Sequence, residues 1–309
     1  MFNNAYKKAK VLITGHTGFK GPWLAIWLKE LGADVVGYSL EPPSEPNNFE
    51  ATKLQEKITH IHGDIRDLDR LIETFKKYQP EFVFHLAAQP LVRLSYDEPK
   101  MTFDPNVGGT VNVLEAVRTI PSVKIMVNIT SDKCYENRGW VWGYRENDPM
   151  GGNDPYSASK GCAELVFSAY LKSFFSPSAS QNRAIGAALW QNPQKYSGAW
   201  NFGPDDSSHL TVATMADRLI KYWGSGAWDD LSDPKALHEA NLLKLNCDKA
   251  HAELYWHSVL TIDECLQMTA DWYKRFYMEN QSPDIYAFCV SQIHGYMDRA
   301  TKKHLPWEK

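Results

Sequence analysis

The sequence alternates short apolar runs with longer segments of helical spacing, and this alternation constrains the fold more than any other feature. The expected strands cover 11–14, 35–40, 58–65, 82–87 and 123–130, and the expected helices cover 19–31, 68–78, 107–120 and 155–175. Strands interleaved with helices in this way predict a parallel sheet covered on both faces. We therefore expect an α/β fold, a doubly wound parallel sheet whose ligands bind beyond the carboxyl ends of the strands.

Composition fits a globular protein of the cytoplasm. The chain has 309 residues, of which 43% are hydrophobic and 23% charged, and its net charge of −4 argues against nucleic acid or a membrane surface as partner. No apolar run could span a bilayer, and the N-terminal MFNNAYKKAK lacks the apolar core of a signal peptide. The five cysteines form no CxxC pair, so we expect neither a disulfide framework nor a metal site.

A glycine-rich turn joins the first expected strand to the first expected helix. In TGHTGFKG, the residues Gly15, Gly18 and Gly21 allow a tight turn and a close approach to a pyrophosphate at the helix N-terminus. The setting predicts a Rossmann-type dinucleotide site, with a plain turn as the alternative. The second strand ends in VVGYSLEP, without the usual ribose-binding acid or a nearby arginine, which favours NAD over NADP. Asp64, which ends the third strand, either approaches the adenine or caps the following turn.

A tyrosine and a lysine are expected to share one face of a later helix. Asp154 is the expected N-cap and Pro155 the first helical residue, so Tyr156 and Lys160 lie one turn apart. An ammonium beside a phenol stabilises the phenolate, and such a tyrosine can act as a base near neutral pH. YxxxK alone is common on surface helices. Its combination with the glycine loop and with a hydroxyl at a buried strand end, Ser131, favours catalysis.

Together these motifs resemble the extended short-chain dehydrogenase/reductase family. The resemblance is carried by Gly15/Gly18/Gly21, HLAAQ at 85–89, Asn106 in NVGGT, Ser131 and Tyr156/Lys160. In the family's sugar-nucleotide epimerases small residues generally follow the catalytic Ser or Thr, whereas nucleotide-sugar 4,6-dehydratases place an acid and a second functional group there. The segment SDK, with GHTGFKGPWL and HLAAQPLVR, looks like the CDP-glucose 4,6-dehydratases. The match runs from about residue 10 to 175 and resumes from GAWNFGP to the TADWYKRFY helix.

The resemblance implies an internal redox reaction with bound NAD as cofactor. Tyr156 takes the proton from the sugar 4-hydroxyl while hydride leaves C4, Ser131 bonds the same oxygen, and Lys160 holds the tyrosine and the nicotinamide ribose. Water then leaves across C5 and C6, with a protonated Asp132 as the acid at O6. Lys133 stands where relatives carry a glutamate base, and acts either as a neutral base or as a charge partner of the enolate. For Asp132 and Lys133 the ordinary alternative is a capping acid and a solvated base.

The resemblance also implies the remaining site residues and partners. The cofactor residues would be Gly15, Thr17, Gly18, Phe19, Gly21, Asp64, Ile65, Leu86, Ala87, Ala88, Asn106, Tyr156 and Lys160. The substrate, CDP-glucose, would meet Gln89, Arg93, Ser131 and Tyr144. For Arg93 a surface ion pair is the alternative, and for Tyr144 it is packing. A homodimer would form through the helices over 107–120 and 156–175, and the product would feed deoxysugar synthesis for surface polysaccharide.

One segment departs from the family pattern. After residue 175 the chain reads SPSASQNRAIGAALWQNPQKYSG, where the family has a strand ending in Gly-Asn, a glycine-rich loop and an Arg-Pro element that grips the nucleotide. Either the polypeptide lacks several dozen residues here, or the sequence in hand passes over them, and the intact flanking matches favour the second. We expect a dinucleotide-binding domain over 1–182 and a smaller C-terminal α/β substrate lobe over 183–309.

Two other functions stay open. One is a different extended-family dehydratase or an epimerase, which substrate profiling would separate. The other is a non-catalytic NAD-dependent binding or regulatory protein. The intact Ser131, Tyr156 and Lys160 argue against the second, whereas the absent segment argues for it.

Overall fold

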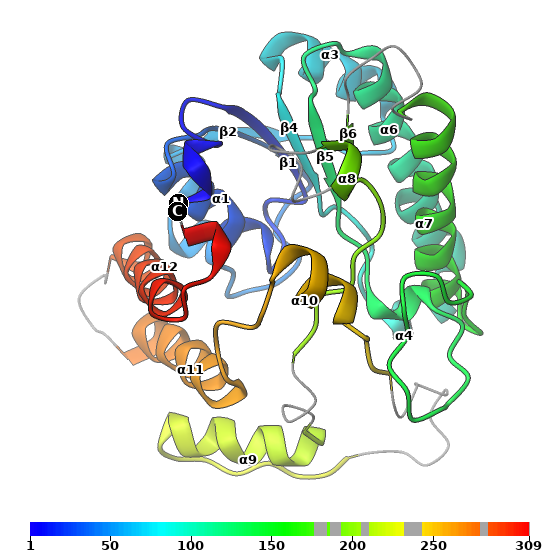
Figure 1. Cartoon of the computed structure of the whole chain (residues 1–309). Coiled ribbons are helices and arrows are strands. Elements are labelled where there is room, and N and C mark those ends of the chain that lie inside the picture. Colours follow the sequence, from blue (N-terminus) through cyan, green and yellow to red (C-terminus); the bar gives the residue numbers. More distant parts are fainter. Residues whose placement is uncertain (176–183, 186–192, 205–209, 232–242, 279–283, 309) are drawn as a thin grey trace.

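A parallel sheet forms the centre of the protein (Figure 1). The computed structural model describes residues 1–175, 184–185, 193–204, 210–231, 243–278 and 284–308. Its six strands pair in the order β3-β2-β1-β4-β5-β6, all parallel. They are β1 (Lys10–Thr14), β2 (Asp34–Ser39), β3 (Thr59–His62), β4 (Phe82–His85), β5 (Ile125–Asn128) and β6 (Ala184–Ile185). The order reverses between β1 and β4, so this doubly wound sheet has its switch point, where ligands bind, beside the glycine-rich turn.

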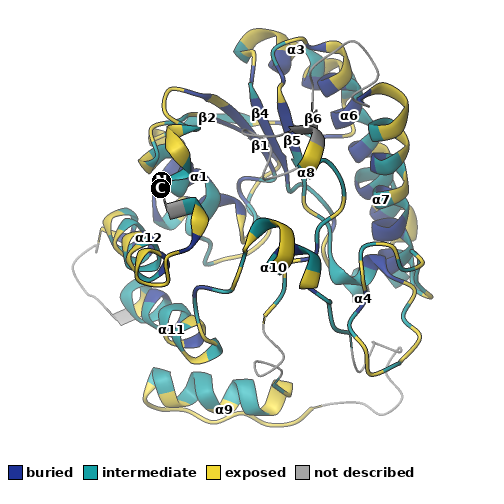
Figure 2. Ribbon diagram, viewed as in Figure 1, coloured by how far each residue is buried: buried dark blue, intermediate teal, exposed yellow. Residues whose placement is uncertain are grey.

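Two hydrophobic clusters cover the two faces of the sheet, because alternate strand residues point to opposite sides. Val11 and Ile13 of β1 pack with α1 (Gly21–Glu30), whereas Leu12 packs on the other side with α3 (Leu68–Tyr78) and α6 (Thr110–Thr119). Phe167 of α7 (Pro155–Phe174) joins the second cluster. Figure 2 shows the middle strands mostly buried between helices whose outer faces are exposed, whereas β3 at the edge of the sheet is only half-buried. The expected fold class is therefore confirmed.

The shorter elements and the C-terminal helices complete the described structure. The helices are α2 (Asn48–Ala51), α4 (Val92–Asp97), α5 (Pro99–Phe103), α8 (Pro193–Tyr196), α9 (Val212–Trp223), α10 (Asp248–Leu254), α11 (Ile262–Met278) and α12 (Ile285–Lys302). Single-turn segments are η1 (Phe2–Asn4), η2 (Leu54–Glu56), η4 (Asp132–Cys134) and η6 (Pro306–Glu308), and η3 (Asp104–Gly109) is π-helical. Within the described ranges, none of these helices has the length and apolar character needed to cross a membrane.

The last two helices return to the sheet. Trp272 of α11 and Ile285, Cys289 and Ile293 of α12 are buried in the same cluster as α1 and β1. In Figure 1, α12 accordingly lies beside α1, while α9 and α10 lie beyond the sheet. The predicted boundary at 182/183 falls outside the described residues and stays a prediction. The C-terminal part of the chain nevertheless contributes to the core of the N-terminal domain.

Several element ends differ from their expected positions. The strand expected over 58–65 ends at His62, and the one expected over 123–130 covers only Ile125–Asn128. The helix expected over 107–120 begins with the π-helical η3 before α6. Helix α3 has the expected bounds because Asp67 caps it, its carboxylate accepting the Arg70 N–H at 3.0 Å. Asp67 thus takes the role of helix cap that was one alternative for Asp64.

Candidate active site

The glycine-rich turn packs closely against the residues that follow β4. Gly15 has φ +76°, and a Cβ there would lie 2.6 Å from the Ala87 nitrogen. A Cβ on Gly21 would lie 2.4 Å from the Gly15 carbonyl oxygen, so both positions require glycine. At Gly18, by contrast, a Cβ would meet only the Gly15 oxygen, at 3.4 Å. The turn is therefore closed against the protein on one side and bare at its middle glycine, which fits a loop that admits a phosphate group.

The side chains around this turn are held by their neighbours. The buried Thr17 donates from Oγ1 to the Leu40 carbonyl at 2.8 Å and hydrogen bonds the Ser39 hydroxyl at 2.8 Å. Phe19 is exposed, and Leu86, Ala87 and Ala88 are half-buried after β4. The end of β2 thus carries the Ser39 hydroxyl at the place where a ribose-binding acid usually stands.

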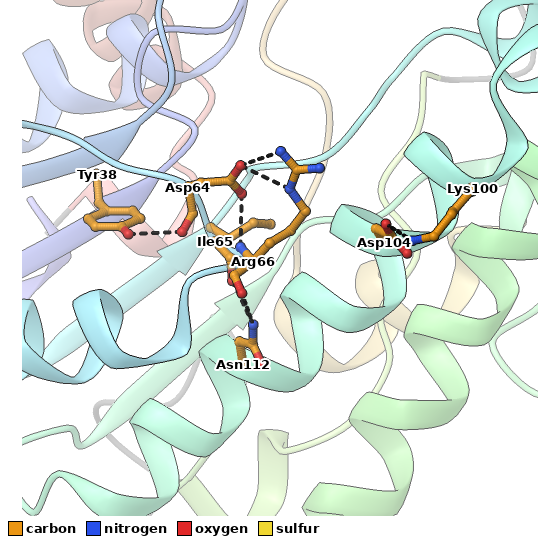
Figure 3. A network of polar contacts seen from close by, with 7 residues as sticks. All are labelled: Tyr38, Asp64, Ile65, Arg66, Lys100, Asp104 and Asn112. Atoms are coloured by element: carbon orange, nitrogen blue, oxygen red, sulfur yellow. Dashed lines mark hydrogen bonds and ion pairs between the residues drawn. The ribbon is translucent and has the colours of Figure 1, made fainter.

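A polar network fixes the backbone after β3 (Figure 3). The Asp64 carboxylate accepts the Arg66 N–H at 2.9 Å and the Arg66 guanidinium through Nε at 2.9 Å and Nη2 at 2.5 Å. Tyr38 donates to the Asp64 carbonyl at 2.9 Å, and Asn112 of α6 donates to the carbonyls of Ile65 and Arg66, each at 3.0 Å. The hydrogen bonds from Arg66 lower the pKa of Asp64, which therefore stays ionised. Contact of Asp64 with an adenine remains a prediction.

Helix α7 presents the tyrosine and the lysine as expected. The Asp154 carboxylate caps the helix by accepting the Ser157 N–H at 2.8 Å, and Pro155 is its first residue. Tyr156 and Lys160 are both buried, and the Lys160 ammonium lies 5.6 Å from the centre of the Tyr156 ring. The Ser95 hydroxyl of α4 accepts the Tyr156 N–H at 3.1 Å. The helix start and the one-turn spacing together place the pair.

Burial dominates the electrostatics of this pair. Burial raises the pKa of Tyr156, and hydrogen bonding with Ser131 opposes that rise. Burial, together with the neighbouring ammonium of Lys20, lowers the pKa of Lys160 to about 8. Without a bound ligand the phenol therefore stays protonated at neutral pH. A positive group placed beside Tyr156 would favour its phenolate.

Ser131, Asp132 and Lys133 lie together in a single turn after β5, next to α7. The Lys133 N–H donates to the Ser131 hydroxyl at 3.2 Å and to the Asp132 carboxylate at 2.9 Å, and the Ser131 hydroxyl donates to the same carboxylate oxygen at 2.9 Å. The capping alternative is thus realised in η4. Because the three side chains are half-buried and Ser131 is near enough to Tyr156 to lower its pKa, the turn also supplies chemistry next to the tyrosine.

Two predicted ligand-contacting residues, Gln89 and Asn106, brace the structure through their side chains. The Gln89 amide donates to the Thr102 hydroxyl at 2.7 Å and to the Leu91 carbonyl at 3.0 Å, and its oxygen accepts the Leu91 N–H. The Asn106 oxygen accepts the Gln89 N–H at 2.8 Å, and its amide donates to the Gln89 carbonyl and to Ser159 of α7. Both side chains are buried. They tie the turn after β4 to α7 and have no amide hydrogen left for a ligand.

Tyr144 is also placed in packing, which favours the alternative given for it. Its side chain is 1% exposed and stacks on Tyr135 with the ring centres 5.5 Å apart. Its hydroxyl accepts the Arg138 N–H at 2.6 Å and bonds Asn137 at 3.2 Å. Contact of Tyr144 with a substrate stays a prediction. Arg93 is exposed on α4, and its contact with a diphosphate stays a prediction.

Sequence reasoning missed several residues that shape the site. His85 at the end of β4 bonds Thr14 at 2.6 Å and Thr110 at 3.2 Å, and burial lowers its pKa to about 3, so it is a neutral link between β1 and α6. On α7, Glu164 accepts a hydrogen bond from Thr130. The four-residue spacing from Lys160 to Glu164 was a signal that could have found it. Among the described residues no cluster of His, Cys, Asp or Glu could hold a metal ion.

Comparison with known proteins agrees with this geometry. The family model described as GDP-mannose 4,6 dehydratase matches residues 12–182. The CDP-glucose 4,6-dehydratase of Salmonella typhimurium is 38% identical over 358 aligned residues, covering 97% of this chain and 99% of the relative. Two solved structures share the fold: dTDP-glucose 4,6-dehydratase of Streptomyces venezuelae (TM-score 0.69, 20% identity, 86% of this chain and 97% of that one) and UDP-glucose 4-epimerase of Thermotoga maritima (0.68, 18%, 86% and 99%). The chain therefore belongs to the GDP-mannose 4,6-dehydratase family of extended short-chain dehydrogenase/reductases.

Proposed function

We propose that this protein is a CDP-glucose 4,6-dehydratase, which converts CDP-glucose into CDP-4-keto-6-deoxy-glucose and water and uses NAD as a bound cofactor. The observation that carries the proposal is the turn of Ser131, Asp132 and Lys133 against Tyr156 of α7. The full-length similarity to the Salmonella enzyme supports it. The uncrowded Gly18 fits the pyrophosphate of the cofactor, and the half-buried segment Leu86 to Ala88 after β4 fits its nicotinamide half.

The chain's own groups divide the reaction among them. Tyr156 removes the proton of the sugar 4-hydroxyl, Ser131 bonds the same oxygen, and the Lys160 ammonium favours the phenolate. The glycine-rich turn at Gly15, Gly18 and Gly21 would hold NAD, which would supply the hydride acceptor for C4 and the hydride donor for C6. Asp132 supplies the proton to the departing O6 hydroxyl. Lys133 stands at the position of the C5 base, where it acts as a neutral amine or as the charge partner of the enolate.

The length of the alignment bears on the segment that departs from the family pattern. The match to the Salmonella relative spans 358 positions, to which this chain contributes about 300 (97% of 309). Several dozen positions of that relative thus have no counterpart here. We place them after residue 175, a segment outside the described residues. A real deletion of this segment would weaken binding of the nucleotide.

We further propose a cytoplasmic homodimer that associates through α6 and α7. On α7, the side chains of Leu165 and Phe174 are 60% and 45% exposed, which is unusual for apolar residues on a long helix. Beside them, Tyr170 of α7 donates to Glu115 of α6 at 2.7 Å, so the two helices present one continuous surface. The keto-deoxy product suits a role in deoxysugar synthesis.

The proposed function is tested by the mass of the product. Purified protein incubated with CDP-glucose and NAD⁺ should yield a nucleotide sugar that is lighter by one water. The same protein with UDP-glucose or GDP-mannose should react at least tenfold more slowly. An isomer of unchanged mass would replace the proposal with an epimerase, and recovery of unaltered CDP-glucose would contradict any catalytic role on this substrate.

Lys160 should set an alkaline limit to activity. Its pKa is lowered from 10.5 to about 8 in the fold, so the ammonium that favours the Tyr156 phenolate is lost as the pH rises through about 8. The value of kcat/KM at saturating NAD⁺ should therefore fall above that pH. Lys20→Met should move the fall to higher pH because it removes a repelling charge. The matched control is Lys172→Met, because Lys172 is exposed near the far end of α7. If the alkaline fall of kcat/KM stayed at the same pH in Lys20→Met, the attribution of that fall to Lys160 would be contradicted.

The same shift has the opposite sign for stability. Between about pH 8 and 10.5 the unfolded chain keeps a proton on Lys160 that the folded chain has released. The unfolded state therefore binds more protons in this window, and the contribution of Lys160 to the free energy of unfolding rises with pH. Loss of activity above pH 8 should consequently occur without loss of folding through this residue.

A further inference from the structure

A hydrogen bond behind the catalytic residues joins the strand that carries Ser131 to the helix that carries Tyr156. Thr130 stands between the end of β5 and Ser131, and its hydroxyl donates to Oε1 of Glu164. Glu164 lies on α7, one turn beyond Lys160 and two turns beyond Tyr156. At a rise of about 1.5 Å per residue, a rigid helix fixes Glu164 relative to Tyr156 over about 12 Å. The Thr130–Glu164 hydrogen bond thus joins the residue before Ser131 to the helix that carries Tyr156.

The surroundings of the Glu164 carboxyl make loss of its hydrogen bond with Thr130 energetically unfavourable. Burial raises the pKa of Glu164, whereas the bond from Thr130 and the charge of Lys160 lower it. The other titratable groups that feel its charge are Cys134 and Tyr135 of the turn facing α7. A buried carboxyl deprived of its donor is left with an unmet desolvation cost. Glu164 therefore holds Thr130 in place more strongly than an exposed pair would.

Backbone packing also brings the same two elements together. A Cβ on Gly161 of α7 would lie 2.9 Å from the Gly151 nitrogen and 3.1 Å from the Cys134 carbonyl oxygen. This contact sets how closely the turn approaches the helix. This backbone contact involves no side-chain hydrogen bond that would orient Ser131 toward Tyr156. The hydrogen bond between the Thr130 and Glu164 side chains can do so.

We propose that Thr130 and Glu164 form a positioning clamp that holds the Ser131 hydroxyl at its working distance from the Tyr156 hydroxyl. The proposal rests on the proposed function only in taking Ser131 and Tyr156 as the reacting pair. Neither Thr130 nor Glu164 takes part in proton transfer. Their effect is on the geometry from which Tyr156 acts, and a small misplacement there lowers the rate without weakening binding.

The test compares variants that keep or remove each half of the bond. Thr130→Val removes the donor and should lower kcat about tenfold with an unchanged KM for CDP-glucose. Thr130→Ser keeps the hydroxyl and should restore kcat to within about twofold. Glu164→Gln keeps an acceptor oxygen and should retain most of kcat, whereas Glu164→Ala should match Thr130→Val. Thr119→Val, an exposed threonine of α6, controls for the loss of a hydroxyl as such.

A structural readout separates failure of the clamp from failure of the proposed function. In the crystal structure of Thr130→Val, the Ser131 and Tyr156 hydroxyls should lie farther apart than in the wild type, and in Thr130→Ser they should not. If wild-type protein leaves CDP-glucose unchanged, the proposed function fails, and the clamp is judged by this comparison alone. An unchanged distance between the Ser131 and Tyr156 hydroxyls in Thr130→Val, or a kcat within twofold of wild type, would overturn the clamp.

Discussion

Tyr156→Phe is expected to lower kcat about 10³-fold while leaving the affinity for CDP-glucose nearly unchanged. The substitution keeps the buried ring on α7 and removes the hydroxyl that takes the proton from the sugar 4-hydroxyl. A positioned general base contributes typically about 10²- to 10⁴-fold, and removal of the Tyr156 hydroxyl removes that contribution. The measurement is the rate of water loss, followed by product mass, with binding of CDP-glucose determined separately by calorimetry.

The matched control for this variant is Tyr277→Phe. Tyr277 lies near the end of α11 with 58% of its side chain exposed, so the same chemical change should leave kcat within about twofold. A Tyr156→Phe enzyme that retained a tenth or more of wild-type kcat would remove the tyrosine from the role of base. The next candidate would then be Lys160, whose pKa is lowered to about 8 by burial.

Local sequence signals predicted the elements whose ends are set by local chemistry. Helix α7 begins where Asp154 and Pro155 place it, and α3 covers its predicted residues because Asp67 caps it. Three strands were predicted too long, since apolar residues continue past the last paired residue, as Ile129 does after Asn128. That α12 returns to α1 could not be predicted, because the burial of Ile285 and Cys289 depends on a tertiary contact with residues more than 250 positions earlier.

The site divides along the same line. The spacing of Tyr156 and Lys160 and the SDK turn were readable, because each depends on neighbours in the chain. The packing roles of Tyr144 and Gln89 could not be predicted, because their polar atoms bond groups that only the folded loops bring to them, the Arg138 N–H and the Thr102 hydroxyl. The pair of Thr130 and Glu164 is intermediate between these cases. The position of Glu164 follows from its four-residue spacing after Lys160 on the helix, whereas its contact with Thr130 depends on the strand order of the sheet.

Asp132→Asn is expected to lower the rate of water loss by about 10²- to 10³-fold and to leave the earlier oxidation at C4 intact. Asparagine has nearly the same shape, and its oxygen can still accept the Lys133 N–H and the Ser131 hydroxyl, so η4 should keep its form. It has no acidic proton for the departing O6 hydroxyl, and loss of a general acid costs a factor of this size. The catalytic cycle should then stop after the C5 hydrogen has become acidic.

The stalled cycle has a signature that separates it from a general loss of activity. In deuterium oxide, CDP-glucose recovered from Asp132→Asn should carry deuterium at C5, since the proton is removed and replaced while no water leaves. Tyr156→Phe should show neither exchange nor water loss, and Asp298→Asn, exposed on α12, should behave as wild type. Water loss within about threefold of wild type would take the acid role from Asp132. Absence of both exchange and water loss in Asp132→Asn would show that the carboxylate is needed before C5, as the partner of Ser131 in positioning the 4-hydroxyl rather than as the acid at O6.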